Sequence, residues 1–335
     1  MTESHRPTLQ DVADAAGLSK AATSYALRGL RGSEETRAKV RDIAEELGYS
    51  ADPIARALAN GRTSSVAIVG SLRDMWQQGL TVMLARALRE QNLSAYIADV
   101  DASPEREQAV LASFAAERID TILTLPVDPS AGYWAELPSE TRVVSIGDAL
   151  TARPDSGCVL FDNEYGVGTA LEHLAGLGHR SIGVLTPSLP STPGRPAELL
   201  ASSLGAANKL QITMASSPTS VAGAAEAATR LLTGDSRPTA LFCQSDSVAF
   251  GAYRAARALG LSIPHDLSIL GYDDSELASL VDPQLSTFGW DEEAIVDAAV
   301  NGLGDPHTMW EPTRTTFRPE FIARDSTAGP APTTH

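Results

Sequence analysis

The chain has 335 residues, of which 43% are hydrophobic and two are cysteines, and its formal net charge is −16. It has no run of eighteen apolar residues and no charged-then-apolar leader, patterns that mark membrane-spanning helices and secretory signals. We therefore expect a cytoplasmic protein without a membrane partner, whose two cysteines, Cys158 and Cys243, are buried thiols.

The negative charge is unevenly distributed along the chain. Residues 1–62 contain nine Lys or Arg and nine Asp or Glu, so the whole excess of −16 lies in the remainder. DNA phosphates repel an acidic body but not a neutral, locally basic head. The distribution therefore agrees with DNA binding through the first segment, although an acidic body also serves solubility alone.

Residues 8–29 predict two short helices joined by a glycine turn. Thr8 can cap the first helix together with Asp11, and Ser19 can cap the second. Gly17 stands where a sharp turn needs a positive φ. The pattern is that of a helix-turn-helix, whose second helix fits the DNA major groove, but other helical hairpins share it.

A third helix is expected to begin after Ser33, with Glu34 and Glu35 in its first turn, and to end at Gly48. Its inward face is predicted to carry Val40, Ile43, Ala44 and Leu47. Residues 51–62 then predict a short helix that is too short to be stable without a partner.

From residue 65 onward, short apolar segments alternate with helical patterns. The predicted strands are 66–69, 94–98, 121–125, 143–146, 158–161, 181–185, 240–243 and 267–270. The predicted helices are 80–91, 104–116, 164–177, 222–232 and 248–259. Such alternation indicates parallel sheets, and about 260 residues are too many for one of them, so two α/β lobes are expected. Ligands of such folds bind at the carboxyl ends of the strands, here between the lobes.

The chain resembles the LacI/GalR family of bacterial transcription regulators. Residue type, order and spacing agree in Thr8-Leu9-x-Asp11-Val12-Ala13, Ala16-Gly17-Leu18-Ser19, Ser33-Glu34-Glu35-Thr36-Arg37, Glu46-Leu47-Gly48-Tyr49 and Gly61-Arg62-Thr63. The resemblance continues, more weakly, to about Ser326. It implies an all-α helix-turn-helix head and an α/β two-lobed body similar to periplasmic binding proteins.

The resemblance also implies where the domains divide. The expected order is a helix-turn-helix domain (1–50), a hinge helix (51–62), an effector-binding and dimerisation domain (63–326) and a disordered tail (327–335). Lobe 1 is expected at about 63–161 and 290–319. Lobe 2 is expected at about 162–289 and 320–326, so the chain crosses between the lobes three times.

In the head, the resemblance assigns contacts to bases, phosphates and the minor groove. Base edges are assigned to Lys20, Ala21 and Tyr25, and the minor-groove hinge to Ala55 and Leu58, of which Leu58 is the wedge that opens a base step. Phosphate contacts are assigned to Thr8, Ser19, Thr23, Ser24, Ser33 and Thr36. Tyr25 replaces the arginine of many members and cannot make its bidentate contact to guanine, so we expect a different operator. Alternatively, Tyr25 packs on the domain surface.

In the body, the resemblance assigns effector contacts to Trp76, Arg195, Ser245, Asp246, Asp273 and Trp290. Asp246 follows a predicted strand, and Asp273 lies in the turn Gly271-Tyr272-Asp273-Asp274. Each aspartate is also a good turn or cap residue. Trp76 and Trp290 depart from the family pattern; they either stack on a sugar or aromatic base or pack at the hinge.

These features predict a cytoplasmic, homodimeric transcriptional repressor. Its expected partners are pseudo-palindromic operator DNA and a small-molecule effector, a sugar or sugar derivative. The alternative is a solute-binding protein without a role on DNA, which leaves the head unexplained. We expect no enzyme, because the sequence has no phosphate loop, nucleophile elbow or paired catalytic base. No cofactor or metal is expected, since the six histidines are scattered.

Overall fold

The computed structural model describes residues 7–27, 31–49, 65–117, 119–187, 209–218, 220–234, 236–305 and 308–331. The chain divides into two units, Met1–Ser64 and Ser65–His335. We describe each unit by itself.

The first unit contains three helices, α1 (Leu9–Ala16), α2 (Lys20–Leu27) and α3 (Glu34–Glu46). α1 begins with a capping box, in which the Thr8 hydroxyl accepts from the Asp11 N–H and the Asp11 carboxylate accepts from the Thr8 N–H. The Gly17 turn has φ +69°, as predicted. The helices share one small core of Val12, Ala16, Ala26, Val40 and Ala44. Leu47, which was predicted to face inward, is 39% exposed, because it lies at the end of α3.

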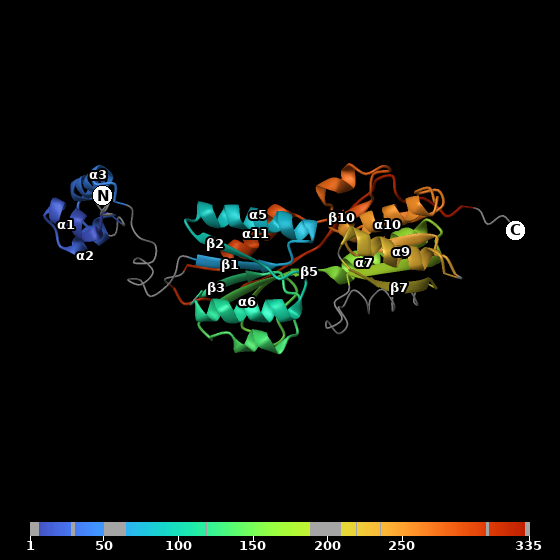
Figure 1. Ribbon diagram of the computed structural model, residues 1–335, viewed down its shortest axis with the longest axis horizontal. Coiled ribbons are helices and arrows are strands. Elements are labelled where there is room, and N and C mark those ends of the chain that lie inside the picture. Colours follow the sequence, from blue (N-terminus) through green and yellow to red (C-terminus); the bar gives the residue numbers. More distant parts are fainter. Residues whose placement is uncertain are drawn as a thin grey trace, which may run out of the picture. The chain divides into compact units, whose positions relative to one another are not determined.

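The second unit has two lobes, each built on a parallel sheet (Figure 1). The six strands of lobe 1 lie in the order β11-β5-β4-β3-β1-β2, and the four of lobe 2 in the order β7-β6-β8-β9. Lobe 1 contains β1 (Ser65–Gly70), β2 (Ser94–Asp99), β3 (Thr121–Thr124), β4 (Arg142–Gly147), β5 (Gly157–Phe161) and β11 (Arg314–Phe317). Lobe 2 contains β6 (Ser181–Pro187), β7 (Gln211–Ser217), β8 (Ala240–Cys243) and β9 (Ser268–Leu270).

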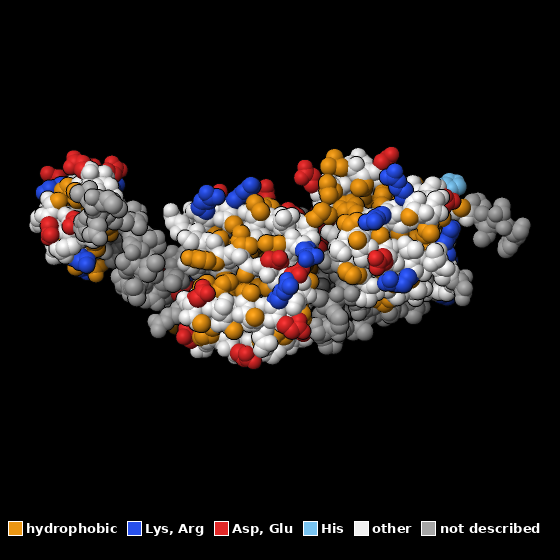
Figure 2. Space-filling view, viewed as in Figure 1, with side chains coloured by type: hydrophobic (Ala, Val, Ile, Leu, Met, Phe, Trp, Pro, Cys, Tyr) orange, Lys and Arg blue, Asp and Glu red, His pale blue; other side chains and the backbone are white. Residues whose placement is uncertain are grey.

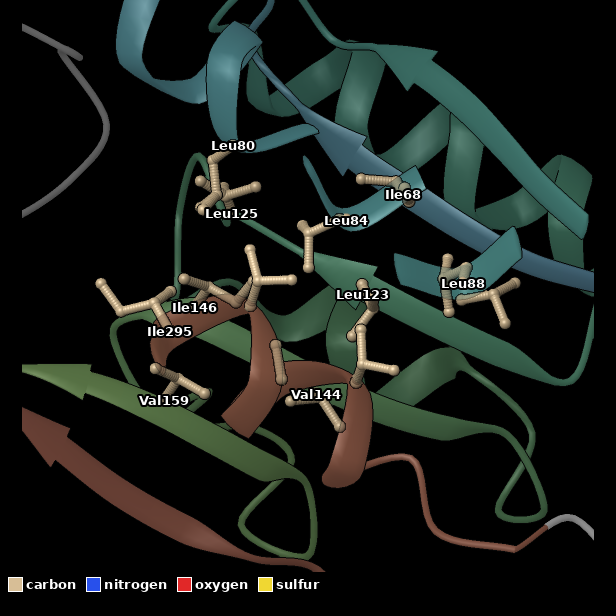
Figure 3. Packing of buried hydrophobic residues seen from close by; sticks show 14 of the residues in the cluster. Ile68, Leu80, Leu84, Leu88, Leu123, Leu125, Val144, Ile146, Val159 and Ile295 are labelled. Carbon is tan, nitrogen blue, oxygen red and sulfur yellow. The ribbon is translucent and has the colours of Figure 1, made fainter. Parts of the chain in front are cut away.

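Helices cover both faces of the lobe 1 sheet. α5 (Met75–Glu90) and α11 (Glu292–Asn301) lie on one face, and α6 (Pro104–Ala116) lies on the other (Figure 1). Leucines of α5 interdigitate with Ile295 and with the strand residues beneath them (Figure 3). Continuous apolar strands such as Val66–Val69 fit this arrangement, since a sheet covered on both faces has no polar side.

Lobe 2 is built in the same way from α7 (Asn163–Gly176), α9 (Val221–Leu232) and α10 (Asp246–Ala258). The smaller elements of the body are η1 (Gly132–Glu136), η2 (Glu276–Ser279), β10 (Thr287–Gly289) and β12 (Glu320–Ile322). β10 and β12 form a two-stranded antiparallel sheet. The chain passes from lobe 1 to lobe 2 after β5, returns after β10, and crosses again between β11 and β12.

The segment after β12 packs against lobe 2. The Ile269 N–H donates to the Ser326 carbonyl at 2.9 Å, and the Ala328 N–H donates to the Ser268 hydroxyl at 3.0 Å. The buried His179 ring lies 2.8 Å from the Ala328 carbonyl oxygen. Residues 327 and 328, which were expected in a disordered tail, are therefore held in place by the side chains of lobe 2.

Candidate functional site

The second helix of the head exposes one continuous face. Lys20, Ala21 and Tyr25 are exposed, and Ser24 beside them is half-buried. Positions four apart lie on the same side of a helix, which places Tyr25 one turn beyond Ala21. The three residues assigned to base contacts therefore form one surface of α2.

Thr23 faces the opposite way. Its side chain is fully buried, and its hydroxyl donates to the Ser19 carbonyl at 3.1 Å. A side chain that is buried in the head and hydrogen-bonded within its own helix does not reach a phosphate. The phosphate contact predicted for Thr23 therefore disagrees with this geometry.

Of the other hydroxyl residues assigned to phosphate, Ser24 lies within α2 and the remaining four lie at helix N-termini. Thr8, Ser19 and Ser33 are exposed and cap α1, α2 and α3, and the Thr36 hydroxyl lies 2.8 Å from that of Ser33. Unpaired backbone N–H groups and the helix dipole make such ends good anion sites. The assignment of these residues to phosphate stays a prediction.

Sequence reasoning missed Arg31, which lies next to this surface. The carbon of its guanidinium is 5.3 Å from the centroid of the Tyr25 ring, a cation–π distance. No spacing rule signals this contact, because Arg31 lies outside α2, in the segment between that helix and α3. Three other predicted site residues, Ala55, Leu58 and Arg195, lie outside the described residues.

A row of aromatic rings joins the two lobes. Trp76, at the start of α5, packs edge-on against Phe161 at the end of β5, with centroids 5.5 Å apart. Phe161 stacks on Trp290 at 4.3 Å, and Trp290 meets the edge of Tyr272 at 5.8 Å. Of the two alternatives for the tryptophans, this arrangement is hinge packing, because Phe161 and Trp290 stand at two crossings of the chain. Phe161 was not predicted as a site residue.

Asp273 lies at the lobe 2 end of this row. It has φ +110°, which side-chain-bearing residues rarely adopt, and its N–H donates to the Phe288 carbonyl at 2.6 Å. Desolvation raises the pKa of the Asp273 carboxyl well above its ordinary value, and the carboxylates of Asp74 and Asp246 raise it further. This acid therefore has a backbone fixed in an unusual conformation and an electrostatic environment that disfavours its charge.

Two indole N–H groups face carboxylates at the same junction. The N–H of Trp290 faces Asp273 and that of Trp76 faces Glu292, and each lowers the pKa of its carboxyl against the opposing effect of desolvation. Both indole nitrogens are buried, yet neither forms a hydrogen bond with the described residues. Each indole N–H therefore lies near a carboxylate without a hydrogen bond of ordinary geometry.

Asp246 and Ser245 are bound within lobe 2. Asp246 is 1% exposed, with one carboxylate oxygen accepting from the Thr287 hydroxyl at 2.7 Å and the other from the Ser275 N–H at 2.7 Å. Burial raises its pKa to about 6. The Ser245 hydroxyl caps α10 by accepting from the Val248 N–H. Asp246 braces the loop that carries Asp273, whereas Ser245 is bonded within α10. Neither residue presents a group outward as the predicted effector contacts require.

Two further observations concern the described part of the chain. Its His, Cys, Asp and Glu residues include no group of three or more that could hold a metal ion. Among the helices that can be described, none combines the length and apolar character needed to cross a bilayer.

Comparison with known proteins identifies both units. Residues 8–52 match the model of the bacterial regulatory proteins of the lacI family, and residues 171–327 match the periplasmic binding protein-like domain. The chain is 30% identical to the ribose operon repressor of Haemophilus influenzae over 287 residues, 84% of this chain and 86% of that protein. It is 30% identical to the HTH-type transcriptional repressor PurR of Escherichia coli over 346 residues, 96% and 97% of the two chains.

Solved structures agree on the fold. The Lac repressor dimer bound to operator and the anti-inducer ONPF superposes with a TM-score of 0.80 at 22% identity, covering 96% of this chain and 99% of that one. A LacI family regulator from Enterococcus faecium with bound ribose gives 0.67 at 22% identity, covering 79% and 99%. With a lacI-type head, a two-lobed body and repressors as relatives along most of its length, this chain belongs to the lacI family of bacterial regulatory proteins.

Proposed function

We propose that this protein is a homodimeric repressor that binds a near-palindromic operator. Its affinity for the operator falls or rises when a small molecule binds between the lobes. The observation that carries the proposal is the exposed face of α2, formed by Lys20, Ala21 and Tyr25 on a three-helix head. A solute-binding protein without a role on DNA has no use for this surface. The role assigns the protein to the cytoplasm, where operator DNA is found.

The dimer follows from how such a head reads DNA. One helix-turn-helix covers one half-site, so two copies related by a two-fold axis match a near-palindrome. In the body, Tyr96 and Ile97 of the edge strand β2 are 52% and 49% exposed. Apolar side chains also gather on the surface over η2, where Leu280 is 70% exposed (Figure 2). An exposed apolar edge strand is avoided in monomers, and a second copy of this chain is the occupant we assign to both surfaces.

The effector is assigned to the junction of the lobes, next to Asp273, Trp76 and Trp290. A hydroxyl group can accept from an indole N–H and donate to a carboxylate, so we assign ligand hydroxyl groups to the pair Trp290 and Asp273 and to the pair Trp76 and Glu292. A ligand with several hydroxyl groups satisfies both pairs, which favours a sugar or sugar derivative. The names of the ribose operon repressor and the ribose-bound regulator support the same class.

Control of DNA binding requires that the ligand distinguish two states of the protein. A ligand with equal affinity for both shifts nothing, however tightly it binds. The row of rings from Trp76 to Tyr272 contacts both lobes, and its contact between the lobes is that of Trp290 with Tyr272, so a ligand that separates these two rings alters the relative position of the lobes. We therefore assign the coupling between effector binding and the arrangement of the lobes to this row of rings.

The effector assignment can be tested with a panel of neutral sugars, sugar phosphates and nucleosides in a thermal-shift assay on the full-length protein. We expect at least one sugar to raise the melting temperature of the protein and to change its affinity for operator DNA. Asp273→Ala should abolish the shift, and Asp297→Ala, at an exposed position of α11, should leave it unchanged. A shift that survives in Asp273→Ala would place the ligand elsewhere.

A further inference from the structure

An arginine and a tyrosine lie together at the exposed face of α2. Tyr25 is 37% exposed on the same face of α2 as Lys20 and Ala21, and Arg31 is exposed with its guanidinium 5.3 Å from the ring centroid. Arginine prefers such stacked positions because its guanidinium is planar and weakly hydrated. The contact brings a cation to a helix face on which Lys20 is the other charged side chain.

The backbone that follows Arg31 is also fixed. Gly32 has φ +104°, a conformation that side chains disfavour, and its carbonyl accepts from the Nε of Arg37 at 3.2 Å. Ser33 then caps α3. Arg31 is therefore attached directly to a turn that is tied to α3, while its side chain lies on a ring of α2. Both ends of the residue are positioned before any partner binds, which reduces the entropy lost on binding.

The neighbouring arginines are engaged differently. Arg37 and Arg41 lie 3.8 Å and 3.2 Å from carboxylate oxygens of Glu34, so their charges are partly compensated within α3. Arg31 instead contacts an aromatic face. An aromatic face accepts no conventional hydrogen bond from the in-plane N–H groups of a guanidinium that stacks on it, so such a guanidinium keeps these groups for other acceptors.

We propose that Tyr25 holds Arg31 so that its guanidinium contacts the O6 and N7 atoms of a guanine in each half-site. This assignment rests on the proposed DNA-binding function and adds a residue to it. A phenol cannot form the bidentate pair that a guanidinium forms with guanine, the commonest specific contact of proteins with the major groove. Arg31, which lies outside α2, thus supplies the guanidinium that Tyr25 of α2 lacks for contacting guanine.

The test compares the full-length protein with Arg31→Lys, Tyr25→Phe, Tyr25→Leu and the matched control Arg41→Lys. An operator is first obtained by selection with the unmodified protein from a random DNA library. Each variant is then titrated against that operator and against versions with each guanine replaced. Circular dichroism of each variant checks that the helices are retained.

In Arg31→Lys, which keeps the charge but not the planar fork, discrimination at one guanine per half-site should fall by roughly 5- to 150-fold. Tyr25→Leu should lower discrimination at the same guanine, and Tyr25→Phe and Arg41→Lys should retain it. If Arg31→Lys weakens all sequences equally, Arg31 contacts phosphate and the proposal is wrong. The proposal is also wrong if Tyr25→Leu retains full discrimination at that guanine. Failure of the unmodified protein to select any site would refute the proposed function itself, and the Arg31 assignment with it.

Discussion

Replacing Asp246 by asparagine should stabilise the body of this protein, although an aspartate at this place resembles an effector contact. The carboxylate is 1% exposed and accepts hydrogen bonds from Thr287 and Ser275. An asparagine of the same shape can keep both bonds, because its oxygen accepts from the Ser275 N–H and its NH2 donates to the Thr287 hydroxyl. The substitution therefore removes a buried charge without leaving a polar group unpaired.

The size of the effect follows from the pKa. Desolvation is the main cause that raises the pKa of Asp246 from 3.8 to about 6, so the folded protein holds its proton more tightly than the unfolded chain. Stability then falls as the pH rises between these two values, and above them ionised Asp246 costs about 3 kcal/mol. The gain in Asp246→Asn should be about 3 kcal/mol at pH 8 and about half of that at pH 5.

Urea unfolding followed by tryptophan fluorescence measures this difference directly. All four tryptophans lie in the second unit, so the signal reports the body and not the head. Asp297→Asn, at an exposed position, is the control and should change little. A variant no more stable than the parent at pH 8 would show that ionised Asp246 does not destabilise the body. So would a gain that is equal at both pH values, since it would come from packing and not from ionisation.

Three further predictions concern the head, the hinge and the lobe junction. Thr23→Val should leave operator affinity within about twofold, because the hydroxyl of Thr23 is bonded within its own helix; a large loss in a binding titration would restore its phosphate contact. Leu58→Ala should weaken specific binding far more than nonspecific binding, and equal losses would remove the wedge assignment. Trp290→Ala should lower the stability of the body in urea by about 2 kcal/mol through the lost stack on Phe161, and an unchanged midpoint would show that the stack contributes nothing.

The sequence predicted the head well because its signals are local. Thr8 and Asp11 are three residues apart, and Gly17 is the residue type that its φ of +69° requires. The strands β7, β10, β11 and β12 were missed for the opposite reason. They are short, or polar as in Gln211–Ser217, and they form because neighbouring strands distant in sequence offer hydrogen-bond partners.

The candidate site shows the same division. The turn motif placed Asp273 at the junction of the lobes, but no pattern in the sequence distinguished ligand stacking from hinge packing for Trp76 and Trp290. That distinction depends on Phe161, which meets both rings only after the chain has crossed between the lobes. The composition of the tail suggested disorder from Thr327 onward. Composition cannot predict that Ala328 contacts the buried His179, which is distant in sequence.

Sequence-specific binding to an operator can be measured by selecting binding sites from a random DNA library with the full-length protein. A single pseudo-palindrome should be enriched, and the dimer should bind it with an affinity that falls steeply as the salt concentration rises. Enrichment of no symmetric sequence would contradict the claim that this member of the lacI family is a sequence-specific repressor.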